Sequence, residues 1–151
     1  MKKRAAKDIW FVSIQLFLFV IYFMPLFSLQ LSIDAFFQNT GLGLTLIGFL
    51  VIIIAILQLN KNLTPFPTPI NNGTLIETGP YKFVRHPIYS GIILTAIGFG
   101  LYNESIWKMG IGLALWILFY FKSQYEETLL LNHYPDYESY RSRTGRFFPF
   151  V

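Results

Sequence analysis

Four long apolar runs constrain the fold of this chain more than any other feature. They cover residues 9–31, 41–59, 87–102 and 106–121, and the second run contains no charged residue. A helix of about 20 apolar residues crosses the hydrocarbon core of a bilayer. The charged share of only 13% agrees, because soluble domains carry roughly a quarter charged residues. We therefore predict an all-α integral membrane protein with about four transmembrane helices.

The distribution of basic residues predicts the topology. Lys and Arg occur before the first run, within positions 2–7, and again within and just after the segment 60–80, at Lys61, Lys82 and Arg85. Residues 30–40 contain none. By the positive-inside rule, the N-terminus and the segment 60–80 lie on the cytoplasmic side. The first run is too long for a signal peptide, and we expect a kink at Pro25. We predict that both termini are cytoplasmic, in the inner or plasma membrane if the source is bacterial.

The chain is predicted to form a single domain over residues 1–151. Residues 1–59 supply two spans, and residues 60–151 supply a loop, a helical hairpin and a polar tail. Pro, Asn and Gly in the segment 60–80 exclude a continuous helix, and loops of this length are often functional. The short connection after residue 102 makes the last two runs an antiparallel hairpin. A short helix is expected near residues 135–143.

Several classes of site are disfavoured by composition. The chain has no cysteine, and its two histidines are not spaced as a metal motif, so we expect no metal centre. The net charge of +4 comes from basic residues beside apolar spans, so we expect no nucleic acid. The pattern leaves no room for a Rossmann fold with its glycine fingerprint. We predict membrane lipids as neighbours and no protein partner.

Polar side chains are concentrated in residues 78–91. Pro87 suits the first position of a helix, so Arg85 and His86 lie at the mouth of the third span. The free N–H groups of that helix end and Arg85 are suited to an anionic group. The alternative is that Arg85 marks the membrane edge, that His86 caps the helix and that Tyr89 is an interfacial aromatic.

The hairpin should bring Glu126 to the same membrane face as Arg85 and His86. One carboxylate, one cation and one imidazole would then form a pocket for a zwitterion. The alternative is a solvated carboxylate in an ordinary i,i+4 pair with Lys122. Gly98 also has two interpretations, because it either lets two helices approach closely or offers a backbone surface to a cofactor.

These residues together resemble a known family. The segments 79–91, 126–130, 137–140 and 146–149 are similar in order and spacing to the isoprenylcysteine carboxyl methyltransferase and phospholipid methyltransferase superfamily of integral membrane enzymes. The resemblance covers roughly residues 75–151, and the first two spans match only in hydropathy. It implies S-adenosylmethionine as methyl donor, bound in a lidded cytoplasmic pocket that opens sideways to lipid.

The resemblance also implies roles for individual residues. Glu126 would meet the amino group of the cofactor, whose sulfonium suits an aromatic face such as Tyr89. Gly98 and Glu127 are further expected cofactor-binding positions. The residues expected to surround the cofactor are Tyr81, Val84, Arg85, His86, Pro87 and Tyr89.

The acceptor is predicted to be a lipophilic molecule in the membrane, either prenylated or lipid-like. The isoprenylcysteine branch has an Arg one turn before the first Glu, and this chain has Lys122 there, which is less suited to a planar carboxylate. An amine acceptor would need a base, for which Glu126, Glu127 and His133 are available. We favour an anionic acceptor held by Lys122, with Lys122 and Glu126 as the catalytic residues, over a phospholipid amine.

Two further interpretations stay open. Membrane sterol reductases resemble the same motifs and use NADPH, whose phosphates would need additional cations. Such enzymes are far larger than this chain. A non-enzymatic scaffold, whose aromatic and basic tail binds anionic lipids, is the other alternative. The cations available for NADPH are Lys82, Arg141, Arg143 and Arg146.

Overall fold

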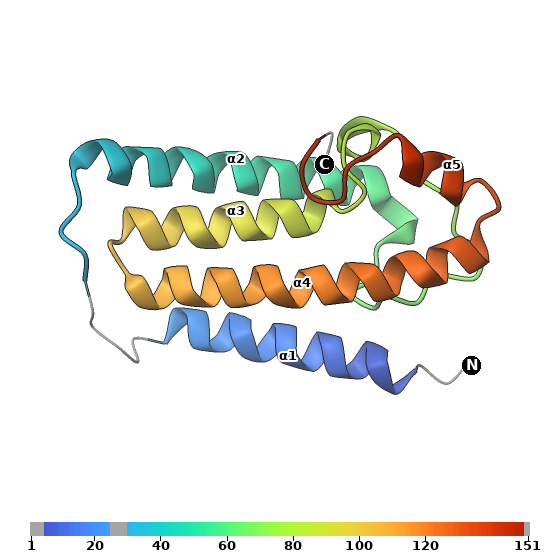
Figure 1. Cartoon of the computed structure of the whole chain (residues 1–151), viewed down its shortest axis with the longest axis horizontal. Coiled ribbons are helices and arrows are strands. Elements are labelled where there is room, and N and C mark those ends of the chain that lie inside the picture. The colour runs from blue at the N-terminus through green and yellow to red at the C-terminus, as the bar shows by residue number, and fades with distance from the viewer. Residues whose placement is uncertain (1–4, 25–29, 150–151) are drawn as a thin grey trace.

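The computed structural model describes residues 5–24 and 30–149, in which four long helices lie side by side (Figure 1). Helix α3 packs against both α2 and α4, and α1 packs against α4. Helices α1, α2 and α4 are long and apolar enough to cross a membrane, and α3 is a shorter apolar helix. The predicted all-α membrane fold is thus confirmed. The bounds are α1 Ala6–Phe23, α2 Ala35–Leu59, α3 Pro87–Tyr102 and α4 Ile106–His133.

Two helices extend beyond the apolar runs from which the spans were predicted, because a helix can continue through polar residues outside the hydrocarbon core. Helix α2 begins at Ala35, since the Asp34 carboxylate caps it by accepting a hydrogen bond from Phe36 N at 2.8 Å. Helix α4 continues past the end of the apolar run at residue 121 and ends at His133. Its last turns are therefore polar. The kink expected at Pro25 lies outside the described residues.

Glycines form the contact between α2 and α3. A Cβ built on Gly98 would lie 2.7 Å from Gly41 O, and one built on Gly48 would lie 2.6 Å from Gly91 O. The two backbones therefore approach as closely as small residues allow. Of the two interpretations of Gly98, close helix packing is the one that the structure supports.

The polar parts of the chain gather at one end of the helices. The beginning of α1, the segment between α2 and α3, the end of α4 and the short helix α5 (Tyr137–Ser142) meet there (Figure 1). The segment between α2 and α3 contains two 3-10 turns, Asn60–Asn62 and Gly79–Lys82. Helix α5 agrees with the short helix expected near residues 135–143.

The C-terminal tail is tied to the mouth of α3 by backbone pairing. Val84 and Gly145 form a parallel bridge. Arg85 N donates to Gly145 O at 2.8 Å, and His86 N donates to Arg146 O at 3.1 Å. This pairing places the side chains of the tail beside those of the motif that begins α3.

Candidate functional site

His86 stands at the N-cap of α3 without capping it. Its side chain makes no cap hydrogen bond, and Pro87 is the first helical residue. The ring instead lies with Nε2 at 3.2 Å from Glu127 Oε1. The alternative in which His86 serves as a helix cap is therefore wrong, and the imidazole is turned toward the end of α4.

Glu127 is the hub of this end of the molecule. It is only 2% exposed, and its Oε1 accepts hydrogen bonds from Arg85 Nε at 3.1 Å and from Arg146 Nε at 3.0 Å. Arg141 Nε lies 3.7 Å from Glu127 Oε2. A buried carboxylate with this many donors is fully engaged. Glu127 therefore joins α4 to the mouth of α3 and to the tail.

Arg85 is engaged as thoroughly as its partner. Besides Glu127, its guanidinium donates to the backbone carbonyls of Arg141, at 2.9 Å, and of Thr144. Arg85, which we expected from the sequence to bind an external anion, thus has its charge compensated within the protein. Its side chain still lines the cavities described below.

Glu126, the neighbour of Glu127, is held much more lightly. Its Oε2 accepts a hydrogen bond from the Tyr89 hydroxyl at 2.7 Å and lies 3.9 Å from His86 Nδ1. The Tyr89 ring stacks on His86 and on Phe119, with centroids 5.3 and 4.5 Å apart. Tyr89 therefore offers its hydroxyl, rather than an open ring face, to this region.

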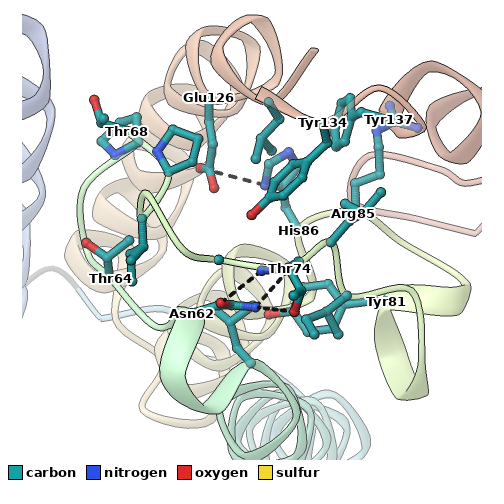
Figure 2. A pocket seen from close by; sticks show the side chains of 18 of the residues that line it. Asn62, Thr64, Thr68, Thr74, Tyr81, Arg85, His86, Glu126, Tyr134 and Tyr137 are labelled. Atoms are coloured by element: carbon teal, nitrogen blue, oxygen red, sulfur yellow. Dashed lines mark hydrogen bonds and ion pairs between the residues drawn. The ribbon is translucent and has the colours of Figure 1, made fainter. Parts of the chain in front are cut away.

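Two cavities meet at these residues. The first cavity has a volume of about 100 Å³ and is roofed by the segment 64–76. Figure 2 shows Thr64 and Thr68 of this roof across the cavity from Arg85. The second cavity has a volume of about 280 Å³ and extends along α3. Both are lined by Tyr81, Arg85, His86 and Glu126.

Three buried tyrosines enclose the first cavity. Burial raises the pKa of Tyr81, Tyr137 and Tyr140 well above the ordinary value, so all three are hydrogen-bond donors at neutral pH. The Tyr140 hydroxyl donates to Tyr81 O at 2.7 Å. The Tyr137 hydroxyl, by contrast, is one of the buried polar atoms without a hydrogen-bond partner in the described part of the chain.

Lys122 lies at the polar end of the second cavity. Its ammonium donates to Gln15 Oε1 at 2.6 Å and to Pro65 O at 2.9 Å, and the residue is 1% exposed. Among the ion pairs of residues 5–24 and 30–149, none joins Lys122 to a carboxylate. The ordinary Lys122–Glu126 pair considered from the sequence is therefore not formed.

The structure brings some of the predicted site residues together and leaves others apart. Val84, Pro87 and Glu127 support the site but line neither cavity, and Gly98 lies in the contact between α2 and α3. His133, proposed as a base, is also absent from both linings. The predicted residues that do line a cavity are Tyr81, Arg85, His86, Tyr89, Lys122 and Glu126.

Sequence reasoning missed the contribution of α1. Asp8 is fully buried and its Oδ2 accepts a hydrogen bond from Thr68 Oγ1, while Gln15 binds Lys122. The two residues are seven positions apart, and hence on one helix face. Polar residues within a membrane span usually have a functional or structural partner, and this signal was present in the sequence.

Comparison with known proteins identifies related chains. The profile of the phospholipid methyltransferase family matches residues 37–137. The nickel-cobalt-cadmium resistance protein NccN of Alcaligenes xylosoxydans xylosoxydans is 36% identical over 76 residues, which cover 50% of this chain and 36% of that protein. The cobalt-zinc-cadmium resistance protein CzcN of Cupriavidus metallidurans is 33% identical over 79 residues, covering 52% of this chain and 37% of that protein.

A further relative and a structural neighbour are both named as methyltransferases. The protein-S-isoprenylcysteine O-methyltransferase of Schizosaccharomyces pombe is 27% identical over 119 residues, which cover 76% of this chain and 50% of that protein. The structure of the eukaryotic intramembrane Ras methyltransferase ICMT superposes with a TM-score of 0.70 at 23% identity, covering 99% of this chain and 55% of that one. The fold is therefore shared, and this chain spans only 36 to 50% of the curated relatives.

Proposed function

Because the chain belongs to the phospholipid methyltransferase family, we propose that it transfers a methyl group from S-adenosylmethionine to a lipophilic acceptor in the membrane. One observation carries this proposal, which is that two cavities share a wall formed by Tyr81, Arg85, His86 and Glu126. A donor in one cavity and an acceptor in the other would meet at that wall. Methyl transfer depends mainly on alignment of the two reactants and exclusion of water.

The side chains that line the first cavity are chemically suited to the polar part of the cofactor. The lightly held Glu126 carboxylate is suited to its ammonium, and the Tyr137 hydroxyl supplies a donor that has no partner within the described protein. Its volume of about 100 Å³ is below the roughly 300–1,000 Å³ of typical ligand sites. We therefore expect the roof formed by residues 64–76 to move outward when the cofactor binds.

The second cavity fits the acceptor. Leu59, Leu63, Ile88 and Ile92 give it apolar walls, while Gln15 and Lys122 give it a polar end. A chain that partitions into lipid would lie along these walls with its headgroup near the shared wall. We propose that Lys122 binds the headgroup of the acceptor and that Glu126 lies between the acceptor and the cofactor.

The two alternative activities have less support. NADPH would need free cations at the site, but Arg141 and Arg146 pair with Glu127 and Arg143 pairs with Glu77. Lys82, the fourth cation considered, lines neither cavity. A phospholipid amine is consistent with the family and would need a base. Glu127 is occupied and His133 lines neither cavity, so Glu126 is the base that the site would offer.

The cytoplasmic side is assigned to the polar end of the helices. The described Lys and Arg residues at that end include Lys7, Lys61, Lys82 and Arg85, whereas the connection between α1 and α2 contains no Lys or Arg. The positive-inside rule then places the cofactor site where soluble S-adenosylmethionine is available.

Calorimetric titration of the purified protein with S-adenosylmethionine tests the donor. We expect saturable binding that weakens at least about tenfold in Glu126→Ala, as expected for loss of a charge-assisted contact. Glu138→Ala is the matched control, because that carboxylate is 72% exposed and lies 3.9 Å from Arg141, its ion-pair partner on α5. Absence of binding by the unmodified protein, or equal losses in both variants, would reject the proposal.

A second assay tests the acceptor side. We expect Lys122→Ala to reduce turnover of lipophilic acceptors much more than it reduces cofactor affinity, because Lys122 lines the second cavity and not the first. Collapse of cofactor binding in Lys122→Ala with unchanged acceptor kinetics would place Lys122 in the donor site instead.

A further inference from the structure

Lys122 is a buried cation whose hydrogen-bond partners are both neutral. Its ammonium donates to the Gln15 side-chain carbonyl and to the backbone carbonyl of Pro65, and its Nζ lies 5.3 Å from the centroid of the Tyr89 ring. A buried charge is costly unless an opposite charge compensates it. In the described part of the chain no carboxylate pairs with it, so one positive charge at the end of the second cavity is left for a ligand.

Gln15 is the reason that this charge stays uncompensated. Helix α1 places the Gln15 amide 2.6 Å from Lys122 Nζ, which is the position where a carboxylate of the same shape would form an ion pair. The amide fixes the ammonium without neutralising it. Gln15 also lines the second cavity, so it lies beside any headgroup that Lys122 would bind.

We propose that Gln15 determines the charge class of the acceptor, because its neutral amide keeps Lys122 available for an anionic headgroup and unfavourable to a cationic one. This inference rests on the proposed function in assigning the second cavity to the acceptor. It assigns a specificity-determining role to α1, a helix that lies outside the residues matched by the family profile.

The other charges near the second cavity do not cancel this effect. Arg85 is compensated by Glu127. Glu126 accepts a hydrogen bond from Tyr89 and also lines the first cavity, where we expect the ammonium of the cofactor. The Asp8 and Glu126 carboxylates also act on the Lys122 ammonium through their charges, but neither forms an ion pair with it in the described part of the chain. Both carboxylates are present in every variant compared below, so the comparison isolates the charge at position 15.

The isosteric change Gln15→Glu tests the proposal, since it changes the charge at this position and leaves the shape. Binding is measured by native mass spectrometry from a neutral detergent, with equal amounts of a farnesyl-chain carboxylate and a farnesyl-chain amine. The unmodified protein should bind the carboxylate preferentially. Gln15→Glu should lower that preference at least about tenfold, because the new carboxylate pairs with Lys122.

Two control variants separate charge from shape and from general membrane electrostatics. Gln15→Met removes the amide but adds no charge, so it should keep the preference for the carboxylate. Gln124→Glu makes the same charge change in the groove between α1 and α4, outside the second cavity, and should leave the preference unchanged. An unaltered preference in Gln15→Glu, or an equal loss in Gln124→Glu or in Gln15→Met, would overturn the proposal.

The binding measurement does not depend on methyl transfer. If the unmodified protein binds no S-adenosylmethionine but the preference still responds to Gln15→Glu, the proposed function fails and the role of Gln15 in charge selection stands. If the cofactor binds and the preference does not respond, the inference about Gln15 fails alone.

Discussion

The Glu127 carboxylate lies 3.1 Å from Arg85 Nε in an ion pair that is almost fully buried. Arg146 and His86 contact the same carboxylate, so one side chain near the end of α4 holds both the mouth of α3 and the tail. Glu126, which precedes Glu127 in α4, has a side chain that is 23% exposed and lines both cavities. Two adjacent carboxylates thus have different roles, one in holding the site together and one in facing the ligands.

The first prediction separates these two roles by isosteric substitution. Glu127→Gln should lower the free energy of unfolding by about 3–5 kcal/mol, because it leaves buried guanidinium groups without their counter-ion. Glu126→Gln should cost less than about 1.5 kcal/mol, since it weakens a single hydrogen bond. Thermal and denaturant unfolding in detergent without cofactor would measure both. Equal losses in the two variants would contradict the division of roles.

The second prediction concerns the contact between α2 and α3. Gly98→Ala should destabilise the protein by about 1–3 kcal/mol, because the new Cβ would lie 2.7 Å from Gly41 O. Gly43→Ala is the matched control on α2, where an added Cβ meets no atom within 4 Å. Gly43→Ala should be neutral or slightly stabilising, since alanine favours helix. Unfolding measurements that show similar losses in both variants would reject close packing at Gly98.

The two interpretations of Gly98 show how far the sequence could predict the site. Hydropathy, Pro87 and the hairpin correctly predicted the helices and the convergence of His86 and Glu126. Spacing alone could not decide whether Gly98 faced a cofactor or another helix, because both explanations require the same small side chain. Only the partner helix, which brings Gly41 against it, separates them.

The different roles of Glu126 and Glu127 depend on contacts with residues that are distant in the sequence. Arg146 reaches Glu127 because the tail pairs with residues 84–86, and a backbone pairing of this kind leaves no periodic pattern in the sequence. Lys122 likewise binds Gln15, a residue more than a hundred positions away. Composition and local spacing identify such polar residues but cannot assign their partners.

The third prediction compares two buried tyrosines of α5. Tyr140→Phe should destabilise the protein by about 0.5–1.5 kcal/mol or more, because Tyr81 O would lose its hydrogen-bond donor. Tyr137→Phe should leave the free energy of unfolding unchanged or raise it, since the lost hydroxyl has no described partner. Both values should be measured without cofactor. A larger loss in Tyr137→Phe would show that its hydroxyl is hydrogen-bonded in the folded protein.

The last prediction concerns the roof of the first cavity. Thr68 donates a hydrogen bond to the buried Asp8 carboxylate, which ties the segment 64–76 to the first turn of α1. Thr68→Val keeps the shape of the side chain but removes this donor, and it leaves Asp8 buried without its partner. Local opening of the roof should therefore become more frequent, and backbone amides of residues 64–76 should exchange hydrogen for deuterium at least severalfold faster. Thr128→Val is the matched control, because the Thr128 hydroxyl donates to the Gln124 carbonyl of its own helix α4. Exchange in the segment 64–76 that stays as slow in Thr68→Val as in Thr128→Val would show that α1 does not hold the roof in place.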